Sequence, residues 1–70
     1  MCEEIFALRI KELRLEKELL QKEVGEKVGL TQRKISKLET LQLTPTPQMI
    51  ADLAKFFDVT TDYLLGLVDD

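Results

Sequence analysis

The spacing of apolar side chains along the chain predicts a series of short helices. In the first segment, about residues 4–18, Phe6, Ile10 and Leu13 recur at the three- and four-residue intervals of one helical face. A later segment that begins at Pro47 repeats this spacing with Ile50, Leu53, Ala54 and Phe57. Two strands in pairing register cannot be found, so the pattern predicts an all-α fold.

Capping residues set the limits of the other helices. A helix is expected at about 21–28, where Gly29 supplies the residue that tolerates the left-handed conformation just past a helix end. Thr31 is a good N-cap for the next helix, at about 32–39, because its hydroxyl accepts an N–H of the first turn.

The same signals apply further along. Thr46 caps the helix that starts at Pro47, where the missing N–H costs nothing. Thr60 caps a short fifth helix, and Gly66 ends it. The chain is therefore expected to be one compact five-helix domain over residues 1–70.

The residue inventory argues against an enzyme. The chain has no His, the commonest general base and metal ligand, and its single Cys, Cys2, cannot form an internal disulfide. Four glutamates are spaced as on solvated helix faces, at Glu12, Glu16, Glu23 and Glu26. We expect no catalytic residues, no metal and no cofactor.

Charge is distributed unevenly along the chain. The formal net charge is −3, which by itself argues against nucleic acid as a partner. However, residues 20–40 carry five basic and three acidic residues, whereas residues 41–70 carry one basic and five acidic. Positive charge is most concentrated at 31–38, which has three basic residues and no acidic one.

The two central helices and their glycine-containing turn, about residues 21–39, fit the helix-turn-helix plan. With about 100° per residue, Arg33 and Lys37 lie nearly opposite the apolar face of the second helix, which carries Ile35 and Leu38. Arg bonds guanine O6 and N7, and Lys reaches the same acceptors or a phosphate. The alternative is that these cations merely form a solvated helix face.

Two charged residues continue apolar stripes. Arg14 follows Ile10 by four residues, and Glu39 follows Ile35 by four. A lone ion on a buried face is costly, so we expect an ion pair between Arg14 and Glu39 that joins the first helix to the third.

The combined pattern resembles the phage repressor and Cro (XRE-like) family of helix-turn-helix proteins over residues 10–66, about four-fifths of the chain. The matching residues are Arg14, Gln21, Val24–Gly29, Thr31, Ile35–Glu39 and Val59–Gly66. The resemblance implies a lambda repressor-like fold that binds operator DNA as a symmetric dimer. It also implies the ion pair above, a phosphate contact from Gln21, and DNA contacts from the third helix.

These arguments together give a set of candidate site residues. The candidate base contacts in the major groove of double-stranded DNA are Gln32, Arg33 and Lys37. The candidate backbone contacts are Gln21, Thr31, Lys34, Ser36 and Thr40.

Three departures from the family pattern stand out. Leu20 replaces the usual Ser or Thr cap, so the second helix is expected to start loosely, and Gly25 replaces the usual Ala. The segment 40–44 lacks the basic residues that grip the DNA backbone in the family, and we expect it to expose Leu41 and Leu43 to DNA or to a protein partner. Fewer phosphate contacts should lower the affinity and flatten its salt dependence.

Two functions remain open. The first is a sequence-specific transcription repressor that acts as a homodimer. The second is a protein-interaction module of the same fold, such as a heterodimerising regulator or an antitoxin. The apolar residues of the tail at 63–70, Leu64, Leu67 and Val68, form either a dimer surface or part of the core. An acidic start and the absence of an apolar run of about 20 residues predict a cytoplasmic protein without a membrane partner.

Overall fold

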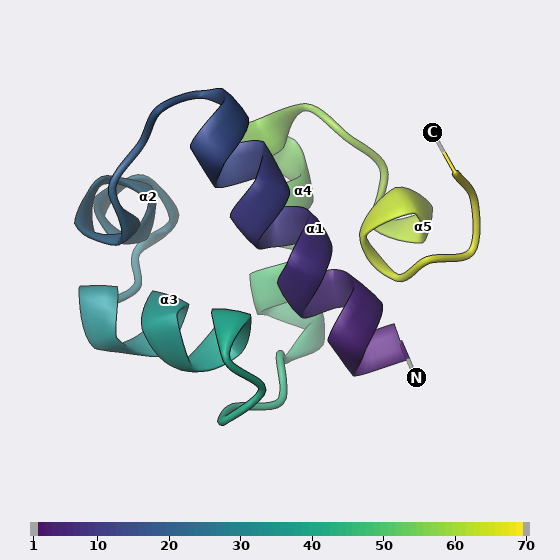
Figure 1. Cartoon of the computed structure of the whole chain (residues 1–70), viewed down its shortest axis with the longest axis horizontal. Helices are drawn as coiled ribbons and strands as arrows, with labels where there is room; N and C mark the ends of the chain where they lie inside the picture. Colours follow the sequence, from purple (N-terminus) through teal and green to yellow (C-terminus); the bar gives the residue numbers. More distant parts are fainter. Residues whose placement is uncertain (1, 70) are drawn as a thin grey trace.

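The computed structural model describes residues 2–69 and contains five α-helices in that part of the chain (Figure 1). Their bounds are α1 Cys2–Glu16, α2 Gln21–Val28, α3 Gln32–Glu39, α4 Pro47–Phe57 and α5 Thr61–Leu64. No strand occurs between residues 2 and 69, and the predicted all-α class is confirmed. None of these helices has the combined length and apolar character that crossing a membrane requires.

The helices are arranged so that α3 lies along one edge of the molecule. The helices α2 and α3 pack against each other, and α1 crosses in front of α4 while it contacts α3 (Figure 1). On the other side, α5 contacts both α1 and α4. The start of α1 and the segment after α5 therefore lie on the same side of the molecule, away from the start of α3.

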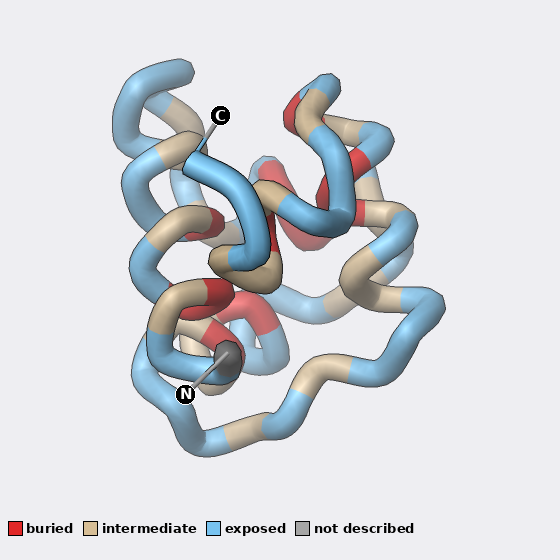
Figure 2. Tube along the Cα trace, turned by 90° about the vertical axis from the view of Figure 1, so that its right-hand side faces the viewer, coloured by how far each residue is buried: buried red, intermediate tan, exposed pale blue. Residues whose placement is uncertain are grey.

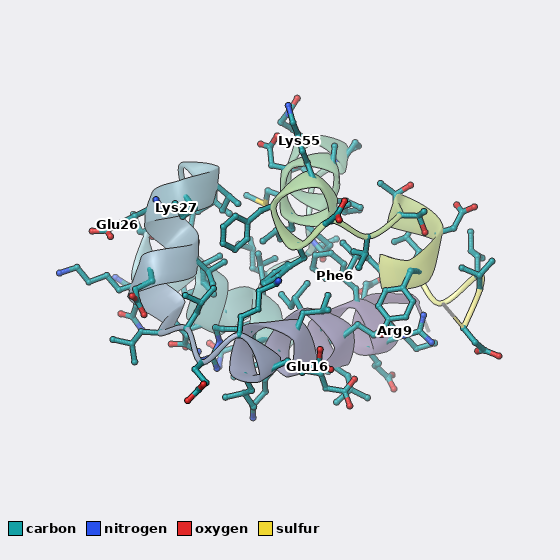
Figure 3. All side chains as sticks on the ribbon, turned by 90° about the horizontal axis from the view of Figure 1, so that it is seen from above. Phe6, Arg9, Glu16, Glu26, Lys27 and Lys55 are labelled. Carbon is teal, nitrogen blue, oxygen red and sulfur yellow. The ribbon has the colours of Figure 1, made fainter. Side chains whose placement is uncertain are left out.

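One apolar cluster fills the space between the helices. Its buried members come from all five helices and are Phe6, Ile10, Val24, Ile35, Leu38, Leu53, Ala54, Phe57 and Leu64. The buried stretches gather in the middle of the molecule (Figure 2), and Phe6 points from α1 into the centre (Figure 3). Because burying a side chain of this size contributes about 1.5–3 kcal/mol, this small core supplies most of the stability.

All five helices end with the same backbone motif. A residue with positive φ follows each helix. The backbone N–H of the next residue donates to the carbonyl of the residue five positions before that next residue, at 2.8–3.0 Å. This is the Schellman arrangement, which satisfies carbonyls that the helix leaves without a partner. The positive-φ residues are Glu18, Gly29, Leu41, Asp58 and Gly66.

The motif explains where the predicted limits of α1 were wrong. The helix was expected to run to Glu18, but it ends at Glu16 because Glu18 adopts the left-handed conformation with φ 55°. It also starts two residues early, at Cys2, which brings Glu3 and Glu4 into a first turn where the helix dipole favours acidic side chains.

The apolar residues of the tail divide into two groups. Leu64 is completely buried and belongs to the core, so for this residue the second of the two alternatives, closure of the core, is the one that the structure has. By contrast, Leu67 and Val68 follow the end of α5 and are exposed. The chain closes its core with α5 and leaves the next two apolar side chains in solvent.

Replacing Leu41 with glycine should raise the free energy of unfolding by about 1 kcal/mol, because Leu41 has φ 65° and its Cβ is unfavourable there. Urea unfolding followed by circular dichroism measures this change. Leu41→Ala is the matched control, since it removes the exposed side chain but keeps the Cβ. An equal gain in both variants would show that the backbone conformation is not the cause.

Candidate nucleic-acid interface

The turn between α2 and α3 holds the two helices close together. Gly25 is buried in α2, and a Cβ built on it would lie 2.6 Å from the carbonyl oxygen of Leu30. Two atoms cannot approach so closely, so the missing side chain is what lets the turn rest on α2. Gly29, with φ 75°, then reverses the chain direction.

The two helices of this unit start in different ways. The hydroxyl of Thr31 accepts the N–H of Lys34 at 3.1 Å and caps α3, as expected. The side chain of Leu20 has no acceptor, but the carboxylate of Glu23 accepts the N–H of Leu20 at 2.8 Å. This bond is half of a capping box, so the start of α2 is better fixed than the sequence had suggested.

Arg14 and Glu39 form a salt bridge between α1 and the end of α3. Arg14 Nε donates to Glu39 Oε2 at 2.7 Å, and Arg14 Nη2 donates to Glu39 Oε1 at 3.0 Å. The side chains are 11% and 3% exposed. The bond to Glu39 raises the pKa of Arg14 further above its ordinary value, although burial opposes this shift. Arg14 also donates to the carbonyl of Leu19 at 2.9 Å, which ties down the turn after α1.

Hydrogen bonds continue from this pair to the start of α3. Gln21 Nε2 donates to Glu39 Oε1 at 3.1 Å, and Gln32 Nε2 donates to Gln21 Oε1 at 2.8 Å. Because a carboxylate is acceptor-only, it holds the amide nitrogen of Gln21 inward. The amide oxygen of Gln21 is then the acceptor for Gln32. The first residues of α2 and α3 are thus joined, and their amides are oriented by a buried charge.

The outer side of α3 is most exposed at its beginning. Thr31, Gln32, Arg33 and Lys34 are all exposed, whereas Ser36 and Lys37 are half-buried. Arg33 and Lys37 were both expected to face solvent opposite the apolar side of the helix; Arg33 does, whereas Lys37 is partly covered. The only acid of this helix, Glu39, is buried in its pair with Arg14, so the charges that α3 presents to solvent are positive.

Thr40 and the segment after it form the other end of this surface. The hydroxyl of Thr40 donates to the carbonyl of Ser36 at 2.9 Å. Leu41 is exposed as predicted, but Leu43 is half-buried and packs against the core. No basic residue occurs between Thr40 and Thr46. The structure thus brings Gln21, Gln32 and the first turn of α3 together, and places Thr40 at the far end of the helix.

Three hydrogen bonds of this surface were missed by the sequence analysis. The bond from Leu20 to Glu23 has a sequence signal, because an acidic residue at the third position of a helix is typical of a capping box. The bonds that join Gln21 to Glu39 and Gln32 have none, since they depend on how α2 and α3 pack.

This arrangement agrees with what comparison with known proteins shows. A helix-turn-helix family model matches residues 10–64, and the chain belongs to this family, of the XRE/Cro-C1 type. The chain is also 30% identical over 66 residues to YobD of Bacillus subtilis (strain 168), a protein named as an uncharacterized HTH-type transcriptional regulator. The match covers 94% of this chain and 59% of YobD, so the chain spans little more than half of that relative.

Replacing Glu39 with alanine should lower the free energy of unfolding by about 3–5 kcal/mol, because it leaves the Arg14 charge buried without its partner. The whole free energy of unfolding of a chain of this length is roughly 4–10 kcal/mol. A loss of this size should therefore unfold much of the protein near body temperature. Thermal unfolding measures the loss. Glu26→Ala, at an exposed position of α2, is the control. A melting temperature as high as that of the control would contradict a structural role for the pair.

Proposed function

We propose that this chain is a sequence-specific DNA-binding transcription regulator, a repressor that binds a palindromic operator as a dimer. In this proposal, the first turn of α3 enters the major groove and reads base edges, as the second helix of such a unit does. The dimer would repress by occupying the DNA that the polymerase needs. Membership of the helix-turn-helix family supports DNA as the partner.

One observation carries the proposal. The exposed first turn of α3 bears Arg33 and Lys34, and the bonds through Gln21 and Glu39 hold it against the rest of the domain. A reading helix needs both features, because base edges must be met by side chains whose positions are already fixed. An incidental basic helix face would need no such chain of bonds behind it.

The orientation of Gln32 suggests which base it reads. One N–H of its amide is used by Gln21, which leaves the amide oxygen and the second N–H free to bind DNA. Adenine presents the complementary pair in the major groove, since its N6 donates and its N7 accepts. We therefore assign adenine to Gln32, guanine to Arg33, and either a base or a phosphate to Lys37.

The remaining candidates are proposed as phosphate contacts. Gln21 and Thr31 stand at the starts of α2 and α3, where backbone N–H groups also face an anion. Lys34, Ser36 and Thr40 complete the set. Because the segment 40–46 has no cation, the number of phosphates neutralised should be small, and the affinity should fall only gently with salt.

A specific feature favours the second candidate function, a protein-interaction module. Leu41 is 54% exposed beside the end of α3, at the place where the family often grips the DNA backbone. A protein partner would cover this side chain, whereas DNA gains little from it. We rank this function second because it does not explain why the side-chain amides of Gln21 and Gln32 are held in a fixed orientation.

Selection of bound duplexes from a random-sequence pool tests the proposal directly. We expect a palindrome whose half-sites are about ten base pairs apart, since the two reading helices of a dimer meet successive turns of one face of DNA. The selection should be run at two salt concentrations. Negligible binding at the lower one would refute the proposal and favour a protein partner.

Two substitutions then test the base assignments on the selected duplex. Arg33→Ala and Gln32→Ala should each weaken specific binding by about 1–3 kcal/mol and relax the preference at one base pair, a G·C and an A·T respectively. Titration of duplexes mutated singly at each position measures this. Lys34→Ala is the contrast, since an equal loss on every duplex is expected when a phosphate contact is removed. An equal loss for Arg33→Ala would make Arg33 a phosphate contact instead.

A further inference from the structure

A cavity of about 420 Å³ opens between the end of α2 and the outer side of α4, and the proposed reading of DNA uses none of its residues. Its wall is formed by Lys27, Val28, Asp52, Lys55 and Phe56. Pockets for small molecules in proteins commonly have volumes of about 300–1,000 Å³, so this cavity has room for one small ligand.

The packing of two helices creates this cavity. Lys27 and Val28 are the last two residues of α2. Asp52, Lys55 and Phe56 stand at the three- and four-residue spacing of one face of α4. This face lies beside the apolar stripe of α4 that enters the core. Because α2 and α4 are in contact, the end of one helix and this face of the other enclose a common space.

Part of the wall is apolar and has a fixed position. Phe6 and Phe57 are 1% and 3% exposed, whereas Phe56, the third phenylalanine of the chain, is only half-buried. The ring of Phe56 packs edge-on against that of Phe57, with the ring centres 5.0 Å apart. The rest of its surface adjoins the cavity together with Val28. An aromatic ligand would therefore meet a ring that is already held in place.

The remaining part of the wall carries a net positive charge. Lys27 and Lys55 are exposed, and neither forms an ion pair with another residue between positions 2 and 69. Figure 3 shows both on the side of the molecule opposite to Glu16 of α1. The acid of the wall, Asp52, accepts the amide N–H of Gln48 at 2.8 Å. Two cations and one anion leave the wall with a single positive charge, which one carboxylate would balance.

Each lysine also has a local reason for its position. Both stand in the last turn of their helices, where the helix dipole favours a cation. That effect accounts for each lysine separately. It does not account for the convergence of both on one cavity, beside the phenylalanine that the core leaves partly uncovered.

We infer that this cavity binds a small aromatic carboxylate. The ring of the ligand packs against Phe56 and Val28, and its carboxylate lies between the ammonium groups of Lys27 and Lys55. The occupant is a small molecule rather than a protein, because five residues bound the cavity, whereas a stable protein interface involves roughly 20–30 residues on each partner. The inference does not rest on the proposed function, since the two surfaces share no residue.

Titration with β-naphthoate, followed by two-dimensional NMR of the backbone amides, tests the inference. We expect saturable shifts at the five wall residues and a dissociation constant of about 1 mM, the strength that a ligand of this size typically reaches. The neutral isostere β-naphthamide should bind about three- to tenfold more weakly, because it keeps the rings and loses the charge.

Substitution of the lysines separates the effect of charge from that of shape. Lys27→Gln and Lys55→Gln should each raise the dissociation constant of β-naphthoate by about two- to fivefold, with little change for β-naphthamide. In the double variant, the preference for the carboxylate over the amide should disappear. The matched control is Lys22→Gln, which alters another exposed lysine of α2 that does not line the cavity and should leave the preference unchanged.

Phe56→Leu tests the aromatic contact. This variant keeps an apolar side chain but removes the ring, so both ligands should bind about two- to tenfold more weakly while the preference for the carboxylate remains. The amide spectra report whether each variant is folded. If Phe56→Leu does not fold, the exposed lysine positions still decide the question.

Four results would overturn the inference. The first is the absence of saturable shifts up to about 10 mM of β-naphthoate. The second is a set of shifts that lies away from the end of α2 and the outer face of α4. The third is a preference for the carboxylate that survives in the double lysine variant. The fourth is an equal effect of Lys22→Gln and Lys27→Gln.

Discussion

The buried pair of Arg14 and Glu39 is the constraint on which the rest of the structure depends. Removing two charges from water is expensive, and the cost is offset only when each charge finds nearly all of its partners inside the protein. Glu39 accepts two hydrogen bonds from Arg14 and one from Gln21. Arg14 also donates a hydrogen bond to the carbonyl of Leu19. These bonds require α1, the turn after it, α2 and α3 to keep fixed relative positions. The same carboxylate then orients Gln21, which orients Gln32 on the outer surface. A buried ion pair thereby controls the geometry of an exposed amide.

The pair also changes which charges the molecule presents. The chain is acidic as a whole, but the acid of α3 is turned inward, and the exposed first turn of that helix is positive. Local placement rather than net charge therefore decides what α3 attracts. The absence of cations between Thr40 and Thr46 limits this attraction. Under the proposed function, so few phosphate contacts would leave the affinity to depend more on contacts with base edges than on the phosphate backbone.

The rest of the domain shows how a short chain fixes five helices with a small core. Each helix ends in the same hydrogen-bonded motif, although glycine occupies the left-handed position after only α2 and α5. Glu18, Leu41 and Asp58 adopt the left-handed conformation although each has a Cβ, which makes that conformation unfavourable. At these three positions the sharp helix end and the short connection therefore cost conformational strain. At the far side from α3, Arg9 holds the segment after α5 as Arg14 holds α3, since it donates to the carbonyls of Tyr63 and Val68, which would otherwise need water. Two arginines of α1 therefore position the end of α3 and the segment after α5.

The sequence by itself determined the helices, their caps, the buried faces and the meeting of Arg14 with Glu39. These follow from local preferences and from the 3.6-residue period, which is the same in any context. Only the tertiary structure decided the rest. The left-handed residues at Glu18 and Leu41 carry no local signal, because the connection that follows imposes their conformation. Likewise, Leu64 and Leu67 are alike in sequence, yet one closes the core and the other is exposed. The amide orientations of Gln21 and Gln32 depend on a carboxylate that is 18 residues from Gln21 along the chain, and packing alone brings that group within reach.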